Sequence, residues 1–258
     1  TLMQTNQGLR YKTLKDVTLV GGQAMVEAEA ENVGSNYNVP ANTIVELPVQ
    51  ISGITSIANL EAVTNGYDIE DDDSLRGRYF ERMQTPATSG NKAQYKNWAK
   101  EVTGVGDAKV FPLWNGPGTV KVIIINSNKR AADAELVQKV KDYIDPQPEG
   151  HGEGKAPIGA TLTVVSAVEK AINTTATVIL ANGYTLQQVQ DNFSVNLQKY
   201  LSDMAFNSTY ISYAKIGSIL LSTDGIVDYN NLTLNGGTVN VALADEEIPI
   251  PGTISLGV

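Results

Sequence analysis

Cysteine is absent from this chain of 258 residues, and His151 is its only histidine. Without cysteine the chain forms neither disulfides nor thiolate metal sites, which fits folding in a reducing compartment. No apolar run is long enough to cross a bilayer, so we expect no membrane insertion. No basic and then apolar signal sequence follows Thr1, and a start on Thr1 rather than Met predicts a fragment or a processed chain.

Basic residues are also few, with 19 Lys and Arg against 28 Asp and Glu, a net charge of −9. They are scattered along the chain, whereas proteins that follow a nucleic-acid backbone cluster Lys and Arg to neutralise phosphates. Nucleic acid is therefore not an expected partner. Solubility accounts for the acidity, and a preference for basic partner surfaces is the functional alternative.

The patterning that is present predicts an α+β, multi-domain protein. We expect a β-rich part at 1–65 that is incomplete at its N-terminal end, a middle α/β domain at 66–155 and a C-terminal α/β domain at 156–258. Alternating or short apolar runs in the first part predict strands at 17–20, 24–30, 43–47 and 51–57.

Two helices are expected in the first half of the middle domain. Asp72 or Asp73 can cap a helix that runs to Gln84 and stops at 85–86. Its apolar residues recur every four positions and are expected to pack inward: Leu75, Tyr79 and Met83. A second helix is expected to start at 88 or 89, with Gly104 as its left-handed C-cap. One face of it carries Tyr95, Trp98, Ala99 and Val102.

Further along, strands at 108–113 and 119–126 flank an Asn115–Gly118 turn, and the second strand is apolar enough to be central. A helix at 131–144 is followed by a Gly- and Pro-rich stretch, 145–157, that is typical of a linker or a long loop. The C-terminal part predicts strands at 161–168, 171–181, 226–234, 238–243 and 248–256 and helices at 185–201 and 213–221, the first with a capping box.

Candidate chemical sites in the sequence fit their templates poorly. Asp68, Glu70 and Asp72 have the alternate spacing of a calcium loop, but its sixth and twelfth positions would be Asp73 and Tyr79 instead of Gly and Glu. A helix cap in a solvated acidic turn is the better interpretation. The stretch 150–155 lacks the spacing and the Ser or Thr of a phosphate loop, and His151 lies among its glycines without a partner for catalysis.

The two tryptophans have different expected roles. Trp98 lies on the apolar face of the second helix and is expected in the core. Trp114, at a hairpin tip, is expected to be exposed, either as an interface anchor or packed on its own hairpin. Asp145 and Glu153 are carboxylates without a pairing signal, so we predict no enzyme activity. Asn-x-Ser/Thr triplets at 173, 192, 207 and 231 are chance matches in the absence of a signal sequence.

A series of short motifs in a fixed order is the most informative feature. It runs from Asn32-Val33-Gly34 and Gly53-Ile54 through Gly66-Tyr67-Asp68-Ile69-Glu70 and Asp73-Ser74-Leu75-Arg76-Gly77-Arg78 to Gly116-Pro117-Gly118. Pro86, Gly90-Asn91, Tyr95, Trp98-Ala99, Gly104-Val105 and Ala156-Pro157-Ile158-Gly159-Ala160 keep the same order. Together they resemble the baseplate J-like proteins of contractile phage tails along nearly the whole chain. Two departures are a missing N-terminal portion and Ala41-Asn42 in place of the usual Gly.

The resemblance implies a structural protein without a cofactor or metal. It implies association with other copies and with baseplate wedge, hub or fibre-attachment proteins, in a ring around the tail hub of a particle assembled in the bacterial cytoplasm. The family-motif and candidate interface residues are Asn59, Gly66, Asp68, Asp73, Leu75, Arg76, Arg78, Gly90, Trp98, Gly104, Trp114, Gly116 and Gly118. We expect the helices within 74–103 and the C-terminal domain to supply contacts between subunits.

Two alternatives remain open at this point. Arg76 and Arg78 can instead form local ion pairs with the acidic turn. The β-rich start and the many Asn and Thr residues also suit a secreted adhesin or carbohydrate-binding module, which would need an export signal and an exposed aromatic platform.

Overall fold

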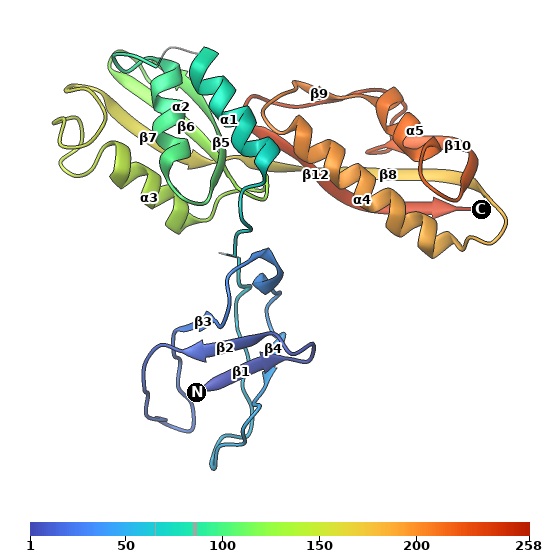
Figure 1. Ribbon diagram of the computed structural model, residues 1–258, viewed down its shortest axis with the longest axis horizontal. Helices are drawn as coiled ribbons and strands as arrows, with labels where there is room; N and C mark the ends of the chain where they lie inside the picture. Colours follow the sequence, from blue (N-terminus) through green and yellow to red (C-terminus); the bar gives the residue numbers. More distant parts are fainter. Residues whose placement is uncertain (65, 85–86) are drawn as a thin grey trace. The chain divides into compact units, whose positions relative to one another are not determined.

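The computed structural model describes residues 1–64, 66–84 and 87–258. They form two compact units, Thr1–Arg78 and Tyr79–Val258 (Figure 1). Separate sheets and packed helices make the protein α+β and multi-domain, as predicted. The three-domain division at 65 and 155 stays a prediction. Within the described ranges, no helix combines the length and apolarity needed to cross a membrane.

The first unit contains a small antiparallel sheet in the order β3-β2-β1-β4. Its strands are β1 Leu2–Thr5, β2 Arg10–Thr13, β3 Ala28–Ala30 and β4 Ile44–Glu46, and a 3-10 turn, η1, spans Ser35–Tyr37. Its apolar cluster is small, with Tyr11, Val39 and Ile44 buried. The Tyr11 hydroxyl donates to the Tyr37 carbonyl at 2.7 Å, so the largest side chain of this core also satisfies its polar end.

Two of the four strands expected in this unit are wrong and two are shorter than expected. Residues 17–20 form only an isolated bridge between Val20 and Gln23, and 51–57 form a turn closed by Ile54 N and Ile51 O. β3 and β4 occupy only the centres or ends of 24–30 and 43–47. Alternating apolar residues indicate that one face of a segment is apolar, but a strand also needs a neighbouring strand to pair with. Val20 illustrates the difference, because its apolar side chain is 80% exposed.

Helix α1 spans Asp72–Gln84, close to the predicted bounds, and crosses the boundary between the units. Its N-cap is Asp71, whose carboxylate accepts from Ser74 N at 2.7 Å, and not Asp72 or Asp73 as expected. The expected stop at 85–86, including Pro86, lies outside the described residues. The expected inward stripe is wrong: Leu75, Tyr79 and Met83 are 48%, 60% and 66% exposed. Spacing of four places these residues on one face of a helix, but it does not supply an element that covers that face.

The first half of the second unit is a three-stranded sheet with two helices. Its elements are α2 Lys92–Glu101, β5 Val105–Pro112, β6 Thr119–Asn126, α3 Ala134–Ile144 and β7 Thr161–Ser166. The sheet order is β5-β6-β7, with β6 antiparallel to β5 and parallel to β7. β6 is central as predicted, and its Val122–Ile125 side chains are fully buried.

The stretch 145–157 is a long loop, one of its two expected forms, and it is packed against its neighbours rather than being a free linker. Lys155 N and Ala156 N both donate to the Ile144 carbonyl, at 2.9 and 2.8 Å. The buried Asp145 carboxylate accepts from Gly150 N at 2.9 Å and from Leu162 N at 3.2 Å. Gly and Pro mark irregular backbone, and here a buried carboxylate holds that backbone in place. The segment is the second half of the crossover that returns the chain through α3 to β7.

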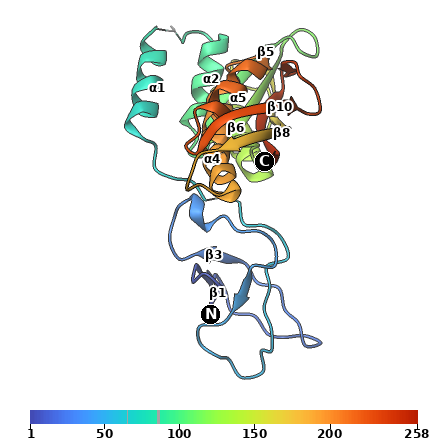
Figure 2. The ribbon, with the colours of Figure 1, turned by 90° about the vertical axis from the view of Figure 1, so that its right-hand side faces the viewer.

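The second half of this unit is a sheet in the order β10-β8-β12. Its elements are β8 Val168–Leu180, α4 Leu186–Met204, β9 Tyr210–Ile211, α5 Tyr213–Leu221, β10 Ile226–Leu234, β11 Val241–Ala242 and β12 Glu247–Gly257. The capping box at Thr185 and Gln188 is confirmed. Helices α4 and α5 lie on the same side of β8 and β10 in Figure 2, and the core between them includes Ile172, Phe193, Leu197 and Ile216.

The two three-stranded sheets of the second unit share contacts between residues far apart in the sequence. Ile123 and Ile125 of β6 pack with Ala205 and Ile248, beyond α4 and in β12. Arg130, in the segment after β6, binds Glu169 of β8 through two nitrogens at 2.7 and 2.8 Å, and Lys109 of β5 and Lys121 of β6 bind Asp245 and Glu246, which directly precede β12. Apolar packing and a row of ion pairs therefore join the middle sheet to the C-terminal sheet.

Candidate interaction surfaces

Asn59 is a hydrogen-bonding hub of the first unit. Its side-chain oxygen accepts from Thr43 N and Ile44 N, both at 2.9 Å, and its nitrogen donates to the carbonyls of Pro40 and Glu61 at 2.9 and 2.7 Å. One side chain thus joins the segment before β4 to a segment about 16 residues later. This geometry gives Asn59 a structural role inside the unit.

Gly66 and Asp68 fasten the end of the same unit. The Asn38 side chain exchanges two hydrogen bonds with the Gly66 backbone, at 2.7 and 2.9 Å. A Cβ on Gly66 would lie 2.2 Å from the Gly34 carbonyl oxygen, so a side chain does not fit there. The Asp68 carboxylate accepts from the Ser35 hydroxyl and, at 2.8 Å, from Ser35 N, and these bonds lower the pKa of Asp68.

The acidic turn and the arginines of α1 form local pairs. Arg78 binds the Glu70 carboxylate through two nitrogens, at 3.0 and 2.7 Å, which raises the pKa of Arg78. Arg76 reaches Asp73 at 3.2 Å, with both side chains well exposed. The local ion pairs that the sequence offered as an alternative role for Arg76 and Arg78 are therefore present. Among the described residues, no three Asp, Glu or His side chains are grouped as metal ligands.

Around α2, two glycines and a tryptophan fix the local packing. Gly90 has φ 74°, and a Cβ there would lie 2.7 Å from Pro157, so the turn before α2 fits tightly against the loop after α3. Trp98 is half-buried and packs edge-on against Tyr95, with ring centroids 5.2 Å apart. The expected C-cap at Gly104 is wrong, because α2 ends at Glu101 and its C-cap is Val102 in an extended conformation; Gly104 has φ 101° in the turn that follows.

Trp114 is exposed at the β5–β6 hairpin, as predicted, with 45% of its surface accessible. Lys121 Nζ lies 5.2 Å from the centre of its ring, so one face of the indole is already used by a cation. Gly116 and Gly118 have positive φ values of 94° and 77°. Gly118 O accepts from Thr161 N at 2.8 Å, which ties the hairpin to the entry of β7.

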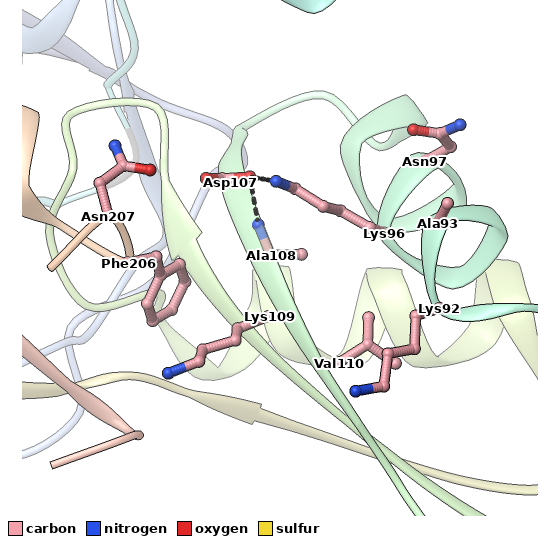
Figure 3. A pocket seen from close by; sticks show the side chains of 10 residues that line it. All are labelled: Lys92, Ala93, Lys96, Asn97, Asp107, Ala108, Lys109, Val110, Phe206 and Asn207. Carbon is pink, nitrogen blue, oxygen red and sulfur yellow. Dashed lines mark hydrogen bonds and ion pairs between the residues drawn. The ribbon is translucent and has the colours of Figure 1, made fainter. Parts of the chain in front are cut away.

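The structure also reveals a hollow of about 300 Å³ that the sequence did not indicate (Figure 3). Lys92 and Lys96 come from α2, Asp107 and Lys109 from β5, and Phe206 from the loop after α4. Lys96 Nζ lies 3.2 Å from the Asp107 carboxylate, and Lys109 Nζ lies 2.7 Å from Asp245. We call this site the lysine hollow. Its walls come from segments about a hundred residues apart, so no local pattern announces it.

The family models account for nearly all of the chain. The baseplate J-like protein barrel domain matches residues 1–66, the baseplate J-like central domain 87–166, and the baseplate J-like protein C-terminal domain 172–257. These matches follow the order of the motifs read from the sequence.

Individual relatives agree with the models. The phage-like element PBSX protein XkdT of Bacillus subtilis is 41% identical over 88% of this chain and 65% of its own length. Baseplate protein gp47 of Escherichia phage Mu is 31% identical over 67% of this chain and 50% of its own length. The chain thus spans less than two thirds of these relatives. A chain of the anti-feeding prophage baseplate structure aligns with a TM-score of 0.47 at 13% identity, over 98% of this chain and 62% of its own. The three ordered domain matches establish that this chain belongs to the baseplate J-like family.

Proposed function

We propose that this chain is a structural component of a phage or phage-like tail baseplate, where its copies contact one another and other wedge, hub or fibre-attachment proteins in a ring around the tail hub. The observation that carries the proposal is the ordered match of three baseplate J-like domains at 1–66, 87–166 and 172–257. The similarity to a Mu protein named as a baseplate protein supports it. The particle would be a contractile tail assembled in the bacterial cytoplasm.

Helix α1 offers a surface suited to such contacts. Leu75, Tyr79, Phe80 and Met83 are between 48% and 66% exposed. Exposed apolar side chains that gather on one element are typical of protein interaction sites. This exposure supports the proposal that the helices within 74–103 contact neighbouring subunits. The arginines compete with that role, because Arg78 and Arg76 already bind Glu70 and Asp73.

Immunogold electron microscopy of particles released from the source cells tests the proposed function. An antibody to this chain should label the distal end of tails, and particles from cells that lack the gene should carry no label. Intact tails without label, with the protein found free or on cell surfaces, would overturn the proposal and favour the adhesin. Charge reversal at Arg76 or Arg78 that leaves folding and assembly intact would remove these arginines from the contact surface.

A further inference from the structure

The lysine hollow reverses the sign of the protein's charge over a small area. Lys92, Lys96 and Lys109 line it with the carboxylate of Asp107, and Asp245 pairs with Lys109, so three lysines face two carboxylates in a chain whose net charge is −9. Lys92 is exposed and makes no ion pair within the described part of the chain. An open hollow with excess positive charge attracts carboxylates, because its field acts on them before and during contact.

The same chain has one strongly acidic segment. Asp68, Glu70, Asp71, Asp72 and Asp73 place five carboxylates within six residues, which we call the acidic run. It belongs to the unit Thr1–Arg78, whereas the lysine hollow belongs to the unit Tyr79–Val258. All of its carboxylates are on exposed residues, including those that bind Ser35, Arg76 and Arg78. Exposed pairs of this kind contribute little, so they can be shared or exchanged at small cost.

A ring of identical subunits that uses one kind of contact requires two different complementary patches on each subunit. An isologous contact uses one patch twice and stops at a dimer, whereas a head-to-tail contact continues until the ring closes. We propose that the acidic run of one copy binds in the lysine hollow of the next copy. The inference rests on the proposed function, because a head-to-tail contact is expected only if copies of the chain repeat around a tail hub. The two patches are made of different residues and carry opposite charge, as such a contact needs.

The contact would be electrostatic and sensitive to salt. Charges at an open site lose most of their attraction beyond about 8 Å at physiological ionic strength. Low salt should therefore strengthen association and speed it, and higher salt should weaken it. Phe206, which lines the lysine hollow, supplies apolar surface on which the stems of the lysines can pack.

Sedimentation velocity of the purified chain at low ionic strength tests the contact with two reversals. Lys92→Glu changes the lysine hollow, and a Glu in the first turn of α2 suits the helix end. Asp72→Lys reverses one charge of the acidic run. If this substitution disturbs the first turn of α1, Asp72→Asn removes the same charge without reversing it. Lys199→Glu and Asp203→Lys are matched controls, because both residues are exposed on α4 and the changes in net charge are equal.

Wild-type chain should associate as its concentration rises, and each reversal should weaken association by roughly tenfold while the controls do not. An equal mixture of Lys92→Glu and Asp72→Lys chains should regain association, because the acidic run of the first meets the lysine hollow of the second. The proposal is overturned if wild type stays monomeric, if the mixture gains nothing, or if salt alters the shape of the monomer without concentration dependence. Failure of the proposed function is a separate result, seen as missing gold label on tails that contain wild-type chain.

Discussion

The two units hold themselves together by different means. In the unit Thr1–Arg78 the buried apolar cluster has three members, Tyr11, Val39 and Ile44, and side-chain amides and a carboxylate fix the loops. In the unit Tyr79–Val258 an apolar core that includes Phe193 and Leu197 spans a sheet and two helices. Burial of apolar surface is the main driving force of folding, so we expect the second unit to be the more stable one.

The difference in core size also determines which kind of residue contributes most to the stability of each unit. A small core leaves the first unit dependent on single polar groups such as Asn59, each of which orders several backbone atoms. A large core distributes stability over many side chains, and the loss of one leaves a cavity but keeps the rest. The two tryptophans, Trp98 and Trp114, both lie in the second unit, so their fluorescence reports its unfolding separately.

The largest expected effect comes from breaking the second core. Phe193→Ala removes a fully buried ring from the face of α4 that packs on the sheet, and it should lower the free energy of unfolding of that unit by about 3–5 kcal/mol. Denaturant titration followed by tryptophan fluorescence measures the change. Val195→Ala, at a residue of the same helix that is 70% exposed, is the control and should cost below about 1 kcal/mol. Equal losses at the two positions would contradict a core on this face.

Gly66→Ala should have the next largest effect, on the first unit. The new Cβ would lie 2.2 Å from the Gly34 carbonyl oxygen and 2.9 Å from the Asn38 amide oxygen, so backbone must move, at a cost of about 2–3 kcal/mol. Gly77→Ala in α1 is the opposite case, because nothing lies within 4 Å and alanine favours a helix by about 0.5–1 kcal/mol. Hydrogen exchange of the β1–β4 amides measures the first change, and helix content measures the second.

Asn59→Ala should destabilise the first unit by about 2 kcal/mol, because two backbone donors and two carbonyls lose their common partner. Amide exchange at Thr43 and Ile44 should quicken, while tryptophan fluorescence of the second unit stays unchanged. Asn6→Ala, at an exposed position in the turn after β1, is the matched control. A loss spread equally over both units would show that Asn59 does not act within its own unit alone.

The smallest expected effect concerns acid. Arg130 lowers the pKa of Glu169 below its ordinary value of 4.5. A group with a lowered folded pKa stabilises the protein above its unfolded pKa, and this stabilisation is lost as pH falls through the folded pKa. Glu169→Gln should therefore cost below about 1 kcal/mol at neutral pH. Its difference from wild type should shrink as pH falls below 4.5. Thermal unfolding between neutral and acidic pH measures it, and a constant difference would contradict the assignment.

What the sequence predicted well was local. The capping box of α4, the apolar strand β6 and the exposed Trp114 hairpin each depend on residues within one element or turn. The acidic first turn of α1 was predicted for the same reason, although the capping residue is Asp71, one position before the expected Asp72 or Asp73.

What the sequence did not predict depends on distant partners. Within the part of the chain that the structure describes, the segments 17–20 and 51–57 pair with no strand beyond the Val20–Gln23 bridge, and the apolar stripe on α1 stays exposed. The lysine hollow joins α2 and β5 to Phe206, and its only signal in the sequence was the presence of lysines. Asn59 was found through the family motif, and its four bonds explain why an amide is suited to that position.

The sheet order β10-β8-β12 has a consequence for how the chain is made. β8 pairs with β12, yet ~66 residues lie between Leu180 and Glu247. At synthesis rates of about 5–20 residues per second, the ribosome needs roughly 3–13 s to make the intervening segment. During that interval β8 has an open edge, to which other nascent chains can add a strand. A chaperone that covers this edge during synthesis would then raise the fraction of chains that reach the folded form.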